Sequence, residues 1–176
     1  MKKLLLAMGF LIILFSCEEI ENSFDLIEAP EQITNKALEY ALKYKDADTE
    51  YYWGGRDYLR SIKIDCSGLV LRTYQYAVNG TQYTLPFQNA TVNTFFNQWT
   101  VIIEDPRPGD IIFMGDDKNN PTHMSIFVEN KEDYIYFIDS TLKPDENIDG
   151  VSERSYLEND SRFLSFGRLL VQVKSP

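Results

Sequence analysis

The segment Ile64-Asp65-Cys66-Ser67-Gly68-Leu69-Val70 places a cysteine where a helix is predicted to begin. Apolar residues at helical spacing continue to about residue 79, and Gly80 is suited to end that helix. A helix N-terminus has unpaired N–H groups and a partial positive charge, which stabilise both a thiolate and an oxyanion. Cys66 is therefore a candidate nucleophile, and the alternative is a buried structural cysteine.

The elements around this helix predict an α+β domain. Helices are expected over about 30–45, 66–79 and 89–97. The second half of the chain has the pattern of strands, which are expected over 101–103, 111–114, 123–129, 134–140 and 164–173. Helices followed by a strand meander indicate N-terminal helices packed on a central antiparallel sheet.

The start of the chain is typical of an export signal. Two lysines precede an apolar run over residues 4–15, which is shorter than the roughly 20 residues that span a bilayer. The run ends in Leu14-Phe15-Ser16-Cys17, which resembles a bacterial lipobox. We expect residues 1–16 to be a lipoprotein signal peptide and Cys17 to carry a lipid that anchors the protein to a membrane. An ordinary signal peptide is the alternative.

Lipidation of Cys17 would make the other cysteine informative. The chain has two cysteines, so an acylated Cys17 leaves Cys66 without a disulfide partner. A free thiol in an exported protein is a candidate reactive group, and a disulfide between the two cysteines is the alternative. The acidic stretch 17–29 is expected to be a tether between the lipid and a single domain over 30–176.

His123 is the one histidine in the chain. It follows a polar loop at the start of a predicted strand, a position from which a side chain can point into a cleft. A cysteine nucleophile needs an imidazole as base and later as acid. Asp139, at the end of the next predicted strand, is the best candidate to orient that imidazole. The alternative is that Asp139 only begins the following loop.

The composition argues against other classes of function. A formal net charge of -10 disfavours a nucleic-acid partner, because phosphate binding needs a cationic surface. One histidine and one available cysteine do not suggest a zinc site, and we expect neither a metal nor a cofactor. We expect a monomer.

Four motifs together resemble the NlpC/P60 family of cell-wall cysteine peptidases. In chain order they are Tyr51-Tyr52-Trp53-Gly54-Gly55, Ile64-Asp65-Cys66-Ser67-Gly68-Leu69-Val70, Arg107-Pro108-Gly109-Asp110-Ile111-Ile112-Phe113 and His123-Met124-Ser125-Ile126-Phe127-Val128. The resemblance implies a papain-like fold and hydrolysis of peptidoglycan stem peptides. Cys66 would attack the scissile carbonyl and His123 would shuttle the proton.

The resemblance also implies residues that bind substrate. Tyr51 and Trp53 match family positions near the active cysteine, and Asp65 and Ser67 match positions that line the D-glutamyl end of the substrate. The third catalytic position in the family is usually His, Asn or Gln, so Asp139 is a departure. Its carboxylate still accepts the imidazole N–H, but the pH profile is expected to differ.

Three functions remain open from the sequence. The first is an endopeptidase anchored in the bacterial cell envelope, with the outer membrane as the expected site. It would cut either the D-glutamyl–diamino acid bond or the D-alanyl–diamino acid cross-link of the stem peptides. The second is a lipoprotein that binds wall peptides without cutting them. The third is an exported toxin against a competitor's wall, which the lipobox argues against.

Overall fold

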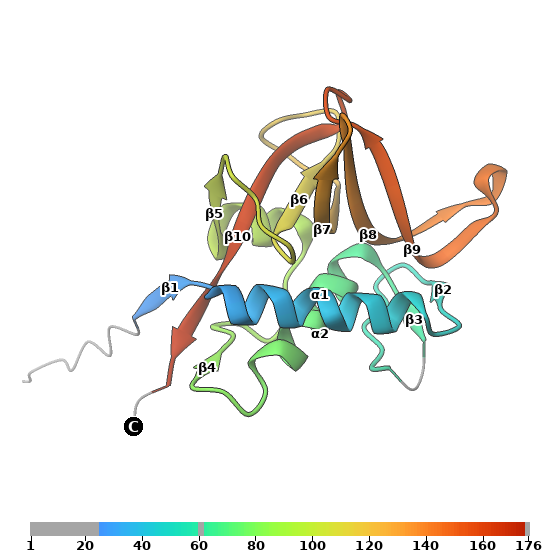
Figure 1. Ribbon diagram of the computed structural model, residues 1–176. Coiled ribbons are helices and arrows are strands. Elements are labelled where there is room, and N and C mark those ends of the chain that lie inside the picture. The colour runs from blue at the N-terminus through green and yellow to red at the C-terminus, as the bar shows by residue number, and fades with distance from the viewer. Residues whose placement is uncertain (1–24, 60–61, 175–176) are drawn as a thin grey trace, which may run out of the picture.

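The computed structural model describes residues 25–59 and 62–174 (Figure 1). The helical elements are α1 (Glu31–Lys45), α2 (Cys66–Val78), α3 (Val92–Thr94), the π-helical turn η1 (Phe95–Trp99) and the 3-10 turn η2 (Pro144–Glu146). The strands are β1 (Leu26–Glu28), β2 (Glu50–Tyr51), β3 (Lys63–Ile64), β4 (Tyr83–Thr84), β5 (Thr100–Ile103), β6 (Ile111–Met114), β7 (His123–Lys131), β8 (Tyr134–Lys143), β9 (Ile148–Leu157) and β10 (Phe163–Val173).

An antiparallel sheet forms one layer of the domain. Its strand order is β1-β10-β6-β7-β8-β9, and β4 and β5 also pair with β10. The first half of β10 pairs with β5 and β6, and its second half pairs with β1 and β4. In Figure 1, β10 accordingly runs from the upper part of the sheet down past the helices to β1. The short strands β2 and β3 form a separate parallel pair.

Both long helices pack against each other, and α2 lies against β7 and β8. The spacing of buried residues on α1 is helical, whereas α2 is buried along most of its length. Full burial of an aliphatic or aromatic side chain contributes about 1.5–3 kcal/mol. Leu69, Val70 and Tyr74 are all completely buried, so α2 is one of the most strongly held elements of the fold. The predicted α+β architecture is confirmed.

The Arg107-Pro108-Gly109-Asp110 turn joins the sheet to the helices. Gly109 has a φ of 91°, and a Cβ atom there would lie 1.9 Å from the carbonyl oxygen of Thr34 in α1. Glycine is therefore required for this close approach. The Gly109 carbonyl also accepts the hydroxyl of Tyr74 in α2 at 2.8 Å. This turn therefore holds both helices against β6. The close packing alone explains why residue 109 is a glycine, and no role in the chemistry is needed.

The domain begins before residue 30, so the predicted extent of the tether is wrong. Residues 26–28 form β1 and pair with β10, and Ala29 is fully buried. The main-chain groups of β1 bond to the edge of β10. This pairing could not be predicted from the acidic sequence of residues 17–29, because the partner strand lies far away along the chain. Residues 1–24 lie outside the described residues, together with the predicted signal peptide and Cys17. Within the described chain, no helix is long and apolar enough to cross a membrane.

The two-residue strands β2, β3 and β4 are not among the predicted strands, and two longer segments also differ from prediction. The helix expected over 89–97 consists of α3 and η1, and the hydroxyl of Thr91 caps it by accepting the N–H of Thr94 at 3.2 Å. Strand β9 was not predicted at all. Its sequence is largely polar, but all ten of its residues pair with β8. Pairing with a neighbouring strand, and not apolar alternation, makes this segment a strand.

Candidate active site

Cys66 is the first residue of α2, and local contacts fix where that helix begins. The side chain of Asp65 caps the helix, because its Oδ1 accepts the N–H of Gly68 at 2.6 Å. The hydroxyl of Ser140 on β8 donates to the carbonyl of Ile64 at 2.7 Å. Cys66 is a free cysteine with 8% of its surface exposed. The thiol is therefore held at a defined place beside the sheet.

His123 and Asp139 lie side by side on the neighbouring strands β7 and β8. His123 Nε2 is 2.6 Å from Asp139 Oδ2, and Asp139 is completely buried. The Cys66 thiol lies near enough to the same imidazole to help raise the pKa of His123. Because Nε2 is bonded to Asp139, Nδ1 is the nitrogen left to exchange a proton with the thiol. The structure thus brings the three predicted catalytic residues into one row.

Arg154 of β9 extends this row and was not identified from the sequence. Its Nε donates to Asp139 Oδ1 at 3.0 Å, and its Nη2 donates to Asp139 Oδ2. The Arg154 side chain is 7% exposed, so the ion pair is almost completely shielded from solvent. A two-point contact between guanidinium and carboxylate is the strongest form of this pair. No local signal marks Arg154, because the contact depends on the pairing of β9 with β8.

Hydrogen bonds outweigh burial in setting the protonation of this row. Burial lowers the pKa of His123, but hydrogen bonds with Asp139 and Cys66 raise that pKa to about 10. Burial raises the pKa of Asp139, yet hydrogen bonds from His123 and Arg154 hold it below its usual value. His123 is therefore a cation and Asp139 an anion at neutral pH, and Arg154 supplies a compensating positive charge.

Alkaline pH is expected to remove stability that His123 contributes. A histidine whose pKa rises from 6.5 to about 10 on folding stabilises the protein fully below pH 6.5, and this contribution is lost as the pH rises toward 10. We expect the difference in unfolding free energy between wild type and His123→Gln, measured in urea, to shrink between about pH 7 and pH 10. Groups that titrate in the same way in both proteins contribute equally to both unfolding free energies, so their contributions cancel when the two values are subtracted. A difference that is constant with pH contradicts the raised pKa.

Arg56 holds two of the predicted substrate-binding residues in place. Its Nη1 donates to Asp65 Oδ1, and its Nη2 donates to Ser67 Oγ at 2.9 Å. The hydroxyl of Ser67 in turn donates to Asp65 Oδ1 at 3.0 Å, and the N–H of Gly54 donates to Asp65 Oδ2 at 2.9 Å. Asp65 and Ser67 are therefore engaged within the protein, and together they fix the loop around Gly54 against the start of α2.

A cleft of about 400 Å³ opens in front of Cys66. Its lining residues are Trp53, Gly54, Arg56, Asp65, Cys66, Ser67, Thr91, Val92, Asn93, Asn120, Pro121 and Thr122. Trp53 is 82% exposed. Tyr51 does not line this cleft, but burial and then the nearby Cys66 and Asp65 raise the pKa of its hydroxyl. The volume lies within the usual range for sites that bind small molecules or parts of a peptide.

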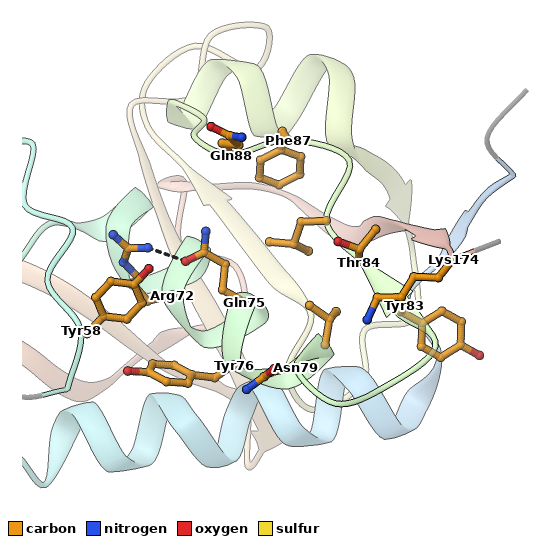
Figure 2. A pocket seen from close by; sticks show the side chains of 12 residues that line it. Tyr58, Arg72, Gln75, Tyr76, Asn79, Tyr83, Thr84, Phe87, Gln88 and Lys174 are labelled. Carbon is orange, nitrogen blue, oxygen red and sulfur yellow. Dashed lines mark hydrogen bonds between the residues drawn. The ribbon is translucent and has the colours of Figure 1, made fainter. Parts of the chain in front are cut away.

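A larger cavity of about 730 Å³ lies along α2 (Figure 2). Tyr58, Tyr76 and Phe87 surround it, and the guanidinium of Arg72 lies 3.9 Å from the ring centre of Tyr58. None of the three predicted catalytic residues lines this cavity. This larger cavity is therefore separate from the reactive groups, and we take the cleft at Cys66 as the candidate active site.

The chemistry that these groups can supply is nucleophilic attack with proton exchange. Cys66 provides a sulfur nucleophile and His123 an acid–base group. The N–H groups of Cys66 and Ser67 lie in the first turn of α2, where the helix offers them no carbonyl partner, so they can stabilise an oxyanion. In the part of the chain that the structure describes, no three His, Cys, Asp or Glu residues are grouped to hold a metal ion.

Comparison with known proteins identifies the family. The sequence model of the NlpC/P60 family matches residues 48–158, which is more than half of the chain. The matched range contains α2 and the row from His123 to Arg154. A search of the curated proteins gives no match to this chain. The α+β architecture agrees with the papain-like fold of the family. The chain belongs to the NlpC/P60 family, whose members are generally cell-wall peptidases.

Proposed function

We propose that this protein is a cysteine endopeptidase that hydrolyses the stem peptides of peptidoglycan. The observation that carries the proposal is the row formed by Cys66, His123 and Asp139. In that row the Cys66 thiol is near enough to the imidazole to help raise its pKa, and the imidazole lies 2.6 Å from a buried carboxylate. This is the arrangement that a cysteine nucleophile and its acid–base partner require. Membership of a family of cell-wall peptidases supports the substrate class.

In the proposed reaction, Cys66 Sγ attacks the scissile carbonyl as a thiolate. The N–H groups at the start of α2 stabilise the resulting oxyanion. The His123 imidazolium then donates its Nδ1 proton to the leaving amine as the C–N bond breaks, which leaves a thioester on Cys66. His123, now neutral, takes a proton from water while the water attacks the thioester. The acid product departs and the thiolate with its imidazolium is restored.

Asp139 would orient the imidazole of His123, and Arg154 would compensate the negative charge of the Asp139 carboxylate. A carboxylate alone would add a full negative charge beside His123, unlike the His, Asn or Gln that is usual in the family. The guanidinium of Arg154 balances this charge through two contacts. The Asp139–Arg154 pair is therefore close to neutral overall while still accepting the imidazole N–H. This explains how an aspartate can occupy the third position without excluding activity.

The anchor and the position in the cell are part of the same proposal. A lipid on Cys17 would hold the enzyme at a membrane of the cell envelope, with the outer membrane as the proposed site. The substrate partner would be the stem peptides of the adjacent wall. The bond cut would be either the D-glutamyl–diamino acid bond within one stem or the D-alanyl–diamino acid cross-link between stems.

Purified peptidoglycan is expected to release shorter stem peptides when it is incubated with the protein. Mass spectrometry of the released muropeptides identifies the bond, because the two candidate cuts leave the diamino acid with a different neighbour. A heat-denatured sample of the same protein is the control. Binding of wall peptides with unchanged muropeptides would instead favour a protein that binds the wall without cutting it.

A further inference from the structure

The larger cavity along α2 shares two loops with the cleft at Cys66. The loop between β2 and β3 contributes Arg56 to the cleft and Tyr58 to the larger cavity. The loop between β4 and α3 contributes Phe87 to the larger cavity and Thr91 to the cleft. The cleft and the cavity therefore have these two loops in common, and a long substrate that lies in the cleft could continue across them into the cavity.

Arg56 ties both loops to the start of α2. Its Nε donates to Asn89 Oδ1 at 3.1 Å, which joins the first loop to the second. Its carbonyl accepts the Nε of Arg72 in the wall of the larger cavity, while its guanidinium holds the Asp65 cap of the helix. The wall of the larger cavity is thus fixed relative to the nucleophile. A group bound there would help to hold the scissile bond in place.

Three aromatic rings line the larger cavity and are supported by their neighbours (Figure 2). Tyr58 is 55% exposed and has the guanidinium of Arg72 over its ring. Tyr76 meets Tyr58 edge-on, with ring centres 6.0 Å apart. Phe87 is stacked on Trp99, with ring centres 5.1 Å apart. The electron-rich face of an aromatic ring attracts the C–H groups of a saturated ring such as that of a sugar.

The free polar groups of this cavity are mainly hydrogen-bond donors. None of the described residues that line it carries a carboxylate. Its two cations, Arg72 and Lys174, donate to main-chain carbonyls. Gln75 Oε1 accepts from Arg72 Nη1, which leaves the Gln75 N–H groups and Arg72 Nη2 without a hydrogen-bond partner among the described residues. Such donors beside aromatic rings suit the carbonyl and hydroxyl oxygens of an N-acetylated sugar.

The proposed chemistry directs the acyl half of the substrate toward this cavity. His123 gives its proton to the leaving amine, so the amine half lies beside His123. The acyl half then extends the other way, along the loops of Arg56 and Thr91. At both candidate bonds, the acyl half leads back along the stem peptide to an N-acetylmuramic acid of the glycan strand.

The length of the stem agrees with this direction. At the D-glutamyl bond, two residues separate the scissile carbonyl from the lactyl group of the sugar, and they span roughly 7 Å. The lactyl group and the sugar ring extend the chain further. Arg72 and Gln75 lie six and nine residues after Cys66, or about 9 and 14 Å along the axis of α2. The sugar that carries the stem would therefore reach the wall of the larger cavity.

We infer that the larger cavity along α2 binds an N-acetylated sugar of the glycan strand that carries the cut stem. The inference rests on the proposed function, which it extends from stem peptides in general to stem peptides that are still attached to glycan. The enzyme would accordingly prefer muropeptides to free peptides. A sugar site also explains the aromatic and donor-rich wall, which the catalytic row does not require.

The first test compares two substrates that contain the same tetrapeptide. One carries the disaccharide of N-acetylglucosamine and N-acetylmuramic acid, and the other carries only a lactoyl cap, so neither has a charged amino terminus. We expect kcat/KM to favour the disaccharide roughly tenfold or more, mainly through a lower KM, because ring contacts and hydrogen bonds to the sugar are added. Tyr58→Ala and, separately, Gln75→Leu should each reduce this preference.

Tyr52→Ala is the matched control. Tyr52 is also 55% exposed and has a cation, Lys63 Nζ, 5.4 Å from its ring centre, but it lines neither the cleft nor the larger cavity. The control should keep the preference for the disaccharide. A preference that survives both Tyr58→Ala and Gln75→Leu would place the sugar elsewhere and overturn the inference.

Binding to the Cys66→Ala protein separates failure of this inference from failure of the proposed function. Saturation-transfer NMR with a neutral trimer of β-1,4-linked N-acetylglucosamine detects the site without turnover, and Tyr58→Ala should weaken the signal. No binding of the trimer together with equal kcat/KM values would overturn the inference and leave the peptidase activity intact. Trimer binding without hydrolysis of either substrate would overturn the peptidase proposal and retain the sugar site. Binding of inorganic phosphate but not of the trimer would assign Arg72 and Lys174 to an anion and overturn the inference.

Discussion

Cys66→Ala is expected to abolish release of muropeptides from peptidoglycan, with a fall in kcat of about 10⁵-fold or more. Removal of the sulfur removes the atom that forms the thioester, and His123 then has no nucleophile to activate. The fold should survive, because alanine suits the first turn of α2 and the Asp65 cap on Gly68 remains. Turnover of a soluble muropeptide and the thermal unfolding midpoint, measured on the same samples, check both statements.

Cys17→Ser is the matched control for this prediction. It removes the other cysteine of the chain but leaves the thiol at the start of α2. Hydrolysis of a soluble muropeptide should be unchanged, since no membrane is involved in that assay. Full activity of Cys66→Ala, or loss of activity in Cys17→Ser, would show that the nucleophile has been assigned to the wrong residue.

Arg154→Met is expected to lower the free energy of unfolding by about 3–5 kcal/mol, because it removes two charge-assisted hydrogen bonds from the buried Asp139 carboxylate and leaves His123 as its one remaining ion-pair partner among the described residues. Asp139 is completely inaccessible to solvent, so water cannot replace the lost contacts. For a domain of this size the loss corresponds to a fall in Tm of roughly 6–20 °C. Urea denaturation near neutral pH, where Asp139 is charged, gives the free energy directly.

Arg162→Met is the matched control, because it also removes an arginine from an ion pair with an aspartate but does so at an exposed position. Arg162 also contacts an aspartate, Asp160, but its side chain is 46% exposed. Exposed pairs of this kind contribute about 0–1 kcal/mol, so the control should be only slightly destabilised. Equal losses for Arg154→Met and Arg162→Met would contradict the strong coupling of Asp139 to Arg154.

The part of the site closest to Cys66 could be predicted because its signals are local. A cap at Asp65 and apolar residues at helical spacing place the cysteine at the start of α2. The single histidine of the chain leaves no other imidazole to pair with it. Asp139 was a prediction from motif alignment and from expected strand order, and the pairing of β7 with β8 puts it 2.6 Å from His123.

The arginines that pair with the aspartates of the site could not be predicted. They lie in segments whose own sequence does not indicate the structure that they adopt. Strand β9 is recognisable only by its pairing with β8, and that pairing delivers Arg154 to Asp139. Arg56 lies in an irregular loop, and its contacts to Asp65 and Ser67 arise where that loop folds back on α2. Strand β1 likewise depends on the open edge of β10.

By itself, the sequence determined the α+β class, the helix that begins at Cys66 and the pair of Cys66 with His123. These features depend on residue spacing and on the scarcity of reactive side chains, both of which can be read along the chain. The tertiary structure alone decided that the Asp139 carboxylate accepts two hydrogen bonds from the Arg154 guanidinium. Those contacts are set by strand register, in which a shift of one residue would turn each side chain to the other face of the sheet.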